Sequence, residues 1–200
     1  MNEIQHNIAI VILAAGSSSR MGSPKQLLSW GNSNLLNVAI EKAIKTVASK
    51  VVVVLGANYK LIEKEIKHQP ITVLNNKNWN LGLGKSISCA AEYILKSDKK
   101  KDGVLIVLAD QPKITTSFLN EIIDDYQLNQ NQIIATSYDD DKFGVPALFD
   151  SFYFKELSKL TDDNGAKNIL KKYKSSVKIL NPPSKNIDID SKEDYKKFHK

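Results

Sequence analysis

Apolar and polar positions follow two rhythms along the chain, one typical of buried strands and the other of amphipathic helices. The segment Ile8–Leu13 has the sequence IAIVIL, a continuous apolar run that predicts a parallel strand covered on both faces. Similar runs predict strands at Val51–Gly56, Ile71–Asn76, Gly103–Asp110 and Ile133–Ser137. Apolar residues at helical spacing predict helices around Leu36–Val47, Leu61–Ile66, Ile87–Leu95 and Phe118–Tyr126. This order predicts an α/β fold with a mostly parallel central sheet and helices on both faces.

The pattern is looser after Tyr138. Val145–Phe149 (VPALF) predicts a strand, with Pro146 at a sheet edge or at the start of the strand, because proline has no N–H for a sheet ladder. Short strands are expected at Val177–Leu180 and Asn186–Ile189, and helices at Asn168–Tyr173 and after Ser191, which suits a helix cap. No internal repeat or linker divides the chain, so residues 1–200 are expected to form a single domain.

The composition is that of a folded globular protein, with 42% hydrophobic and 25% charged residues. The longest apolar stretch, near Ile8–Ala15, is too short to span a bilayer, and the first residues lack the layout of a signal peptide. Cys89 is the single cysteine, which excludes an intramolecular disulfide and a cysteine metal cluster. We therefore expect a cytoplasmic protein that does not bind a membrane.

The formal net charge of +6 suits a small anionic ligand such as a nucleotide. The lysines are scattered, apart from Lys99–Lys101 and the C-terminal end, and no nucleic-acid-binding motif is present. We therefore expect no nucleic-acid partner.

The loop Leu13–Lys25 (LAAGSSSRMGSPK) follows the first predicted strand and carries Arg20, the one arginine among 28 basic residues. In open parallel sheets, ligands bind beyond the carboxyl ends of the strands. Glycine and serine let backbone N–H groups approach a phosphate, while Arg20 offers a planar fork of donors and Lys25 a point charge. The loop predicts a cradle for a polyphosphate, although it matches neither the P-loop nor the dinucleotide-binding glycine pattern.

This loop resembles the signature of the nucleotidyltransferases related to the molybdenum cofactor enzymes. Its double alanine and the following PKQLL are most similar to the cytidylyltransferases that activate molybdopterin, whereas the guanylyltransferases more often have Leu-Ala-Gly-Gly. The resemblance continues through LADQP (Leu108–Pro112), NNKNWNLGLGKSI, FGVPALF, DDNGAKNIL and NIDIDSKEDY, and so covers nearly the whole chain. Two positions depart from the family pattern: Lys167 replaces an arginine, and Val145 stands where several relatives carry histidine.

The resemblance implies a single Rossmann-like nucleotidyltransferase domain that moves CMP from CTP to the terminal phosphate of molybdopterin and releases pyrophosphate. It implies that Arg20 and Lys25 are catalytic and hold the triphosphate. The implied nucleotide-binding residues are Leu13, Ala14, Ala15, Gly16, Ser17, Ser18, Gly22, Asn76, Gly82 and Ser86. Gly144 and Pro146 are implied to bind the acceptor.

Mg²⁺ is the implied cofactor, with Asp110 as a ligand at the end of a buried strand. Either Asp188 or Asp190 is expected to supply a second carboxylate, because alternation in a strand would put both on one face. The resemblance favours Asp188. Asp190 is alternatively a cap of the last helix.

Other functions remain open. A guanylyltransferase, or a sugar-phosphate or polyol-phosphate nucleotidyltransferase, would keep the fold and change the substrate. A nucleotide-binding protein without turnover is a third candidate, although the joint presence of Arg20, Lys25 and Asp110 argues against it. The expected partners are a nucleoside triphosphate and a phosphorylated acceptor, together with transient contact to a molybdoenzyme or its chaperone.

Overall fold

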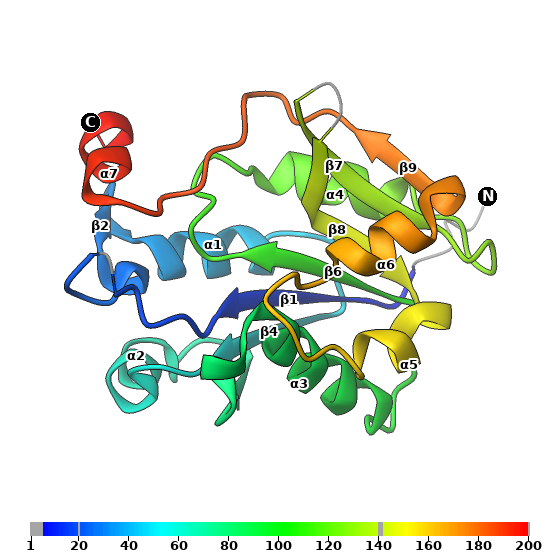
Figure 1. Cartoon of the computed structure of the whole chain (residues 1–200), viewed down its shortest axis with the longest axis horizontal. Coiled ribbons are helices and arrows are strands. Elements are labelled where there is room, and N and C mark those ends of the chain that lie inside the picture. The colour runs from blue at the N-terminus through cyan, green and yellow to red at the C-terminus, as the bar shows by residue number, and fades with distance from the viewer. Residues whose placement is uncertain (1–5, 20, 140–141, 200) are drawn as a thin grey trace.

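The computed structural model describes residues 6–19, 21–139 and 142–199, which form an α/β fold around a seven-stranded sheet (Figure 1). The strand order is β5-β4-β1-β6-β8-β7-β9. The strands are β1 (Ile8–Ala14), β4 (Lys50–Leu55), β5 (Thr72–Asn75), β6 (Gly103–Leu108), β7 (Ile133–Asp139), β8 (Lys142–Asp150) and β9 (Val177–Leu180). β2 (Ser29–Trp30) and β3 (Ser33–Asn34) form a separate small ladder.

The central sheet is mostly parallel, as predicted. β5, β4, β1 and β6 run parallel to one another, and β7 runs parallel to β9. β8 is antiparallel to both β6 and β7. Parallel strands buried on both faces consist of continuous apolar runs, which is why the sequence pattern identified them.

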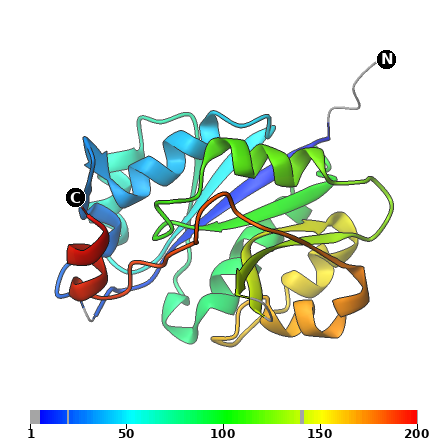
Figure 2. The ribbon, with the colours of Figure 1, turned by 90° about the horizontal axis from the view of Figure 1, so that it is seen from above.

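Helices cover both faces of the sheet (Figure 2). They are α1 (Leu35–Ile44), α2 (Tyr59–Ile66), α3 (Leu83–Leu95), α4 (Thr116–Asp124), α5 (Phe154–Leu157), α6 (Lys167–Lys172) and α7 (Lys192–Phe198). Short 3₁₀ turns lie at η1 (Lys25–Leu27), η2 (Trp79–Leu81), η3 (Ser151–Tyr153) and η4 (Lys174–Ser176). None of the helices in the described ranges is both long and apolar enough to cross a membrane.

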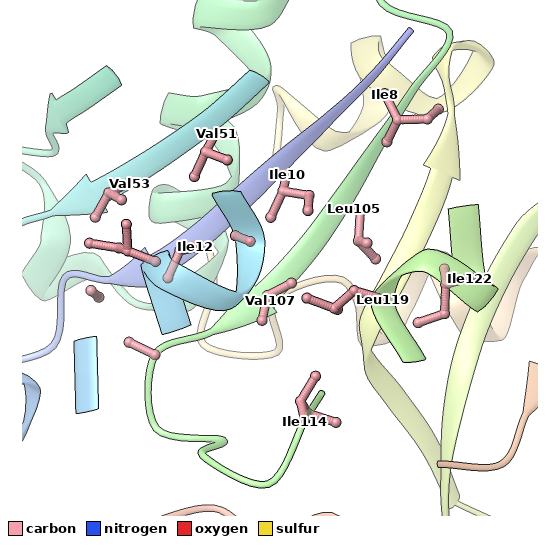
Figure 3. Packing of buried hydrophobic residues seen from close by; sticks show 14 of the residues in the cluster. Ile8, Ile10, Ile12, Val51, Val53, Leu105, Val107, Ile114, Leu119 and Ile122 are labelled. Atoms are coloured by element: carbon pink, nitrogen blue, oxygen red, sulfur yellow. The ribbon is translucent and has the colours of Figure 1, made fainter. Parts of the chain in front are cut away.

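Two hydrophobic cores form because alternate residues of β1 point to opposite faces. Ile8, Ile10 and Ile12 pack with α1, α2 and α4, as Figure 3 shows for the residues of the sheet and of α4. The residues between them, such as Val11, pack with α3, α5 and α6. All of β1 is buried, so this strand is fixed at the centre of the molecule.

Two expectations about the last third of the chain are wrong. Asn186–Ile189 forms no strand; it is an extended segment without ladder pairing. Pro146 lies inside β8, an interior strand, and not at an edge or a strand start. The β7–β8 register passes from Ala147 to Gly144 through an irregularity, so Pro146 falls where no ladder partner needs its N–H.

Candidate functional site

A pocket of about 390 Å³ opens at the carboxyl ends of β1 and β6. These strands are neighbours, with arrowheads toward the same edge in Figure 1, and Leu13 pairs with Leu108. The chain extends the sheet on one side of β1 through β4 and on the other through β6, and this change of direction is where open α/β sheets bind ligands. The lining residues are Leu13, Ala14, Ala15, Gly16, Ser17, Lys25, Gln26, Leu35, Trp79, Asn80, Gly82, Leu83, Ser86, Leu108, Ala109, Asp110 and Asp163.

The loop after β1 is braced by the side chain of Gln26, which is 2% exposed. Gln26 Nε2 donates hydrogen bonds to the backbone oxygens of Ala14 (2.8 Å) and Gly16 (2.9 Å). Its Oε1 accepts a bond from Ser18 Oγ (3.2 Å), which itself accepts the N–H of Lys25 (2.9 Å). These bonds fix the course of the loop and bring Lys25 to the pocket.

The wall opposite this loop depends on close backbone approach at Gly82 and Gly84. Gly82 has a φ of 105°, and a Cβ there would lie 2.3 Å from Asp163 Oδ1. The N–H of Gly84 donates to the oxygen of Asp162 at 2.8 Å, where a Cβ would also clash. A Cβ on Gly16, by contrast, would meet no atom of the described residues within 4 Å. The segment with Asp162 and Asp163 can therefore close one side of the pocket while the space beside Gly16 stays open.

Lys25 joins the loop to two carboxylates. Its Nζ donates a short hydrogen bond to Asp110 Oδ2 and a second bond to Asp190 Oδ1 at 2.8 Å. Burial lowers the pKa of Lys25, but the two carboxylates outweigh this effect and hold the pKa above its ordinary value. The ammonium group therefore stays charged and neutralises the acidic side of the pocket.

Asp188 lies just behind this ion pair, and Gln111 Nε2 donates to its Oδ1 at 2.9 Å. Burial, followed by the nearby charges of Asp110 and Asp190, raises the pKa of Asp188, although the bond from Gln111 works in the opposite direction. Lys25 thus contacts two carboxylates, and Asp188 interacts electrostatically with both of them. Among the described residues of the site, the carboxylates outnumber the ammonium group, and such an environment favours a further cation.

The residues present fit a hydrated Mg²⁺ ion. Asp110 Oδ1 is buried and has no hydrogen-bond partner among the described residues, although such groups are normally paired. Burial, together with the charges of Asp110 and Asp190, raises the pKa of Asp188, so a bound cation would favour its charged form. Within the described ranges, no three acidic, histidine or cysteine side chains form a complete ligand cage, and Mg²⁺ is commonly bound by one or two carboxylates plus waters and substrate phosphates.

The structure brings many of the predicted site residues together. Those that line the pocket are Leu13, Ala14, Ala15, Gly16, Ser17, Lys25, Gly82, Ser86 and Asp110. Ser18 and Asn76 stand behind the lining: Ser18 binds the backbone of Lys25, and Asn76 Nδ2 donates to Ser86 Oγ at 3.1 Å. Gly22 does not line the pocket and occupies a left-handed turn with a φ of 73°. Arg20 lies outside the described residues, so its catalytic role stays a prediction.

The predicted acceptor residues lie in β8, beside the pocket lining and not in it. A Cβ on Gly144 would lie 3.3 Å from the ring of Tyr138, and the oxygen of Pro146 accepts Thr136 Oγ1 at 2.7 Å. Their role also stays a prediction.

Asp190 does not cap the last helix. Ser191 is the N-cap of α7, as expected, and it forms a capping box with Asp194. Asp190 instead uses its carboxylate to bind Lys25. The strand argument that paired Asp188 with Asp190 fails, because no strand forms there.

Sequence reasoning gave no role to several residues that shape this site. Gln26 and Gln111 are polar and nearly fully buried, at 2% and 4% exposure. Both follow a residue singled out for its charge, Lys25 or Asp110. Trp79 forms part of the lining and packs against Gly56. A Cβ added to Gly56 would lie 2.4 Å from the Cβ of Trp79. Burial of a polar amide cannot be recognised in the sequence, although an aromatic residue in a loop is a usable signal.

The family model described as "MobA-like NTP transferase domain" matches residues 10–177. The chain belongs to this family. It is therefore a nucleotidyltransferase, and the residues matched include the loop, Lys25 and Asp110. They do not include the segment that carries Asp188 and Asp190.

Relatives of known sequence or structure agree with this family. The purine catabolism protein PucB of Bacillus subtilis (strain 168) is 27% identical over 196 residues, 92% of each chain. Nicotine blue oxidoreductase of Paenarthrobacter nicotinovorans is 30% identical over 116 residues, and the match spans 56% of this chain and about half (54%) of that protein. The crystal structure of Rv0371c from Mycobacterium tuberculosis H37Rv superimposes with a TM-score of 0.83 at 25% identity, covering 96% of this chain and 97% of that one. Another structure of Rv0371c, 24% identical with a TM-score of 0.80, is a complex with manganese.

Proposed function

We propose that this nucleotidyltransferase transfers CMP from CTP to the terminal phosphate of molybdopterin. A phosphate oxygen of the acceptor attacks the α-phosphorus, the bond from that phosphorus to the β-phosphate oxygen breaks, and pyrophosphate leaves with the electron pair. Catalysis of this kind rests on positioning and charge neutralisation more than on covalent chemistry by the protein.

The observation that carries the proposal is the ion pair between Lys25, at the end of the loop, and Asp110, at the end of β6. It supports a site in which a phosphate-binding cation and a metal-binding carboxylate act on the same phosphates. The backbone N–H groups of Gly16 and Ser17 and the Lys25 ammonium would bind the triphosphate, and Arg20 would add a bidentate grip. Mg²⁺, held by Asp110 and Asp188, would offset the negative charge of the phosphates.

The preference for CTP is proposed from the loop. Ala15 lines the pocket, and its oxygen accepts the N–H of Ala57 at 2.9 Å, so its backbone is held in place. A base bound beside Ala15 would have less room next to the alanine methyl group than next to a glycine, and a purine would need that room. Ser86, on α3, accepts a bond from Asn76 and keeps a hydroxyl proton to donate to a base. A pocket that pairs such groups discriminates between bases more strongly than shape alone, which gives about 1–3 kcal/mol.

The acceptor and the setting are also proposals. Gly144 and Pro146 lie near Asp188 through Gln111 and Val145, which supports an acceptor site on that side of the pocket. We assign the reaction to the cytoplasm, where nucleoside triphosphates are available, with transient delivery of the product to a molybdoenzyme or its chaperone.

The test is a pyrophosphate-release screen that crosses CTP, GTP, ATP and UTP with molybdopterin and common sugar and polyol phosphates in the presence of Mg²⁺. We expect the highest kcat/KM for CTP with molybdopterin. In competition kinetics, Ala15→Gly should raise activity with GTP more than it alters activity with CTP. A wild-type preference for GTP would contradict the cytidylyl assignment, and turnover with a sugar or polyol phosphate alone would contradict the acceptor.

A further inference from the structure

We propose that Gln111 is a positioning residue that holds the carboxylate of Asp188 toward Asp110 and ties it to β8. The inference rests on the proposed function, in which Asp188 is a metal ligand. It concerns how that ligand is held in place. The residues matched by the family model, 10–177, do not include Asp188.

Gln111 has a central place in a buried group of polar side chains. It directly follows Asp110 and is 4% exposed. Its Nε2 lies within hydrogen-bond distance of Asp188 Oδ1 (2.9 Å), the oxygen of Val145 (3.3 Å) and the hydroxyl of Tyr138. An amide nitrogen has two protons for these three acceptors, so the geometry ties the end of β6, the strands β7 and β8, and the segment after β9 to one atom.

Tyr138 completes the link to β8. Its hydroxyl donates a hydrogen bond to the oxygen of Val145, the residue between Gly144 and Pro146. Burial, followed by the charges of Asp188 and Asp110, raises the pKa of Tyr138, so its hydroxyl keeps its proton. The hydroxyl can therefore accept from Gln111 and donate to Val145 at the same time.

The bond from Gln111 matters because the segment around Asp188 has no sheet hydrogen bonds to fix its side chains. Residues 186–189 form no strand. A backbone bond from the N–H of Ile189 to the oxygen of Asp110 (3.0 Å) holds the chain in place. The side chain of Asp188 nevertheless faces the like charges of Asp110 and Asp190. The bond from Gln111 opposes this repulsion and keeps the carboxylate at the site.

The alternative is that Gln111 only stabilises β7 and β8 through Tyr138 and Val145. The two roles differ in what they predict for metal binding. Loss of a group that orients a metal ligand weakens metal affinity by about 10-fold to 100-fold. A purely structural role would change thermal stability and leave the affinity for a metal unaltered.

The experiment measures Mn²⁺ binding to the nucleotide-free chain of residues 1–200 by electron paramagnetic resonance. Asp110→Asn and Asp188→Asn test the ligands, Gln111→Leu and Gln111→Met test the positioning residue, and Tyr138→Phe removes one partner of Gln111. Gln69→Leu is the matched control, since Gln69 bonds to Asn37 away from the site. Circular dichroism checks the fold, and Gln111→Met keeps an unbranched, uncharged side chain of similar length should Gln111→Leu fail to fold.

We expect Gln111→Leu to weaken Mn²⁺ binding about 10-fold to 100-fold and Gln69→Leu to leave it unchanged. In the double variant with Asp188→Asn, the effect of Gln111→Leu should disappear, because both changes act through one carboxylate. Unchanged affinity in Asp188→Asn would overturn the ligand assignment of the proposed function and this inference with it. Weaker binding in Asp188→Asn but not in the Gln111 variants, or additive effects in the double variant, would overturn the inference alone.

Discussion

The two sides of the pocket are held by different kinds of contact. On the loop side, Leu13–Gln26, the bonds made by the side chains of Gln26 and Ser18 join residues at most 12 positions apart, such as Gln26 and Ala14. On the carboxylate side, the bond between Gln111 and Asp188 spans 77 positions, and the bond between Lys25 and Asp190 spans 165. The side-chain bonds of the loop side are therefore local, whereas those of the carboxylate side form only in the folded chain.

The two sides therefore contribute different properties to the site, backbone support on the loop side and charge on the carboxylate side. On the loop side, Gln26 is buried and satisfied at both ends of its amide, so its bonds hold Ala14, Gly16 and Ser18 together without a ligand. On the carboxylate side, Asp188 faces the like charges of Asp110 and Asp190, and the Lys25 ammonium group offsets the charge of the latter two. Lys25 belongs to both sides, so it is the residue at which the two are coupled.

The largest expected effect comes from breaking that coupling with Lys25→Met. Methionine keeps an unbranched apolar side chain and removes the charge. Turnover should fall about 100-fold or more, because a preorganised cation at the phosphates is lost. Mn²⁺ affinity of the nucleotide-free protein should rise severalfold, because Lys25 no longer competes for Asp110 and Asp190.

Steady-state kinetics and Mn²⁺ titration would check the two halves of this prediction. Lys64→Met, an exposed change on α2, is the control. Turnover close to wild type would mean that Lys25 is not a phosphate ligand, and a fall in Mn²⁺ affinity would mean that it supports the metal site and does not compete for it.

A smaller effect is expected from the loop side alone. Gln26→Leu keeps most of the buried volume and leaves the oxygens of Ala14 and Gly16 without their donor. An unsatisfied buried acceptor costs about 1–3 kcal/mol, which lowers the melting temperature of a domain of this size by roughly 3–10 °C. The KM for CTP should rise, and Mn²⁺ affinity should stay unchanged because the carboxylates keep their contacts.

Thermal unfolding, substrate kinetics and Mn²⁺ titration on one preparation would check Gln26→Leu. A loss of Mn²⁺ affinity equal to that of Asp110→Asn would show that the two sides do not act separately.

The same contrast explains how much the sequence predicted. The parallel strands are continuous apolar runs, such as Ile8–Leu13, and such runs can be recognised in the sequence. The predicted α/β fold with a mostly parallel sheet is confirmed. Pro146 was wrongly expected at an edge or a strand start, because a bulge that removes the need for its N–H depends on the partner strand. Asn186–Ile189 has the alternation of apolar and polar residues that is typical of a strand, yet it forms no strand.

The candidate site divides in the same way. Lys25 and Asp110 were recognisable because each ends a segment with its own pattern. The pairing of Lys25 with Asp190 and the bond of Gln111 to Asp188 could not be predicted. Both depend on where residues 186–190 contact the end of β6 in the folded chain. Burial of an amide, as in Gln26, is likewise a property of the folded chain.

The smallest expected effect sharpens the account of the carboxylate side. Asp188→Asn keeps an oxygen that can accept from Gln111 and removes a charge that faces Asp110 and Asp190. Without metal or nucleotide, this change should raise the melting temperature at neutral pH by a few degrees. A residue kept for function at the expense of stability behaves in this way.

The pH dependence gives the decisive measurement. The pKa of Asp188 is higher in the folded protein than its ordinary value of 3.8, so the folded state binds the proton more tightly than the unfolded state. The destabilising charge is fully present above the folded pKa and disappears as the pH falls toward the unfolded pKa. The gain from Asp188→Asn should therefore be largest at neutral pH and vanish in acid. A gain that is equal at both ends of the scan would mean that hydrogen bonding, and not charge repulsion, separates aspartate from asparagine at this position.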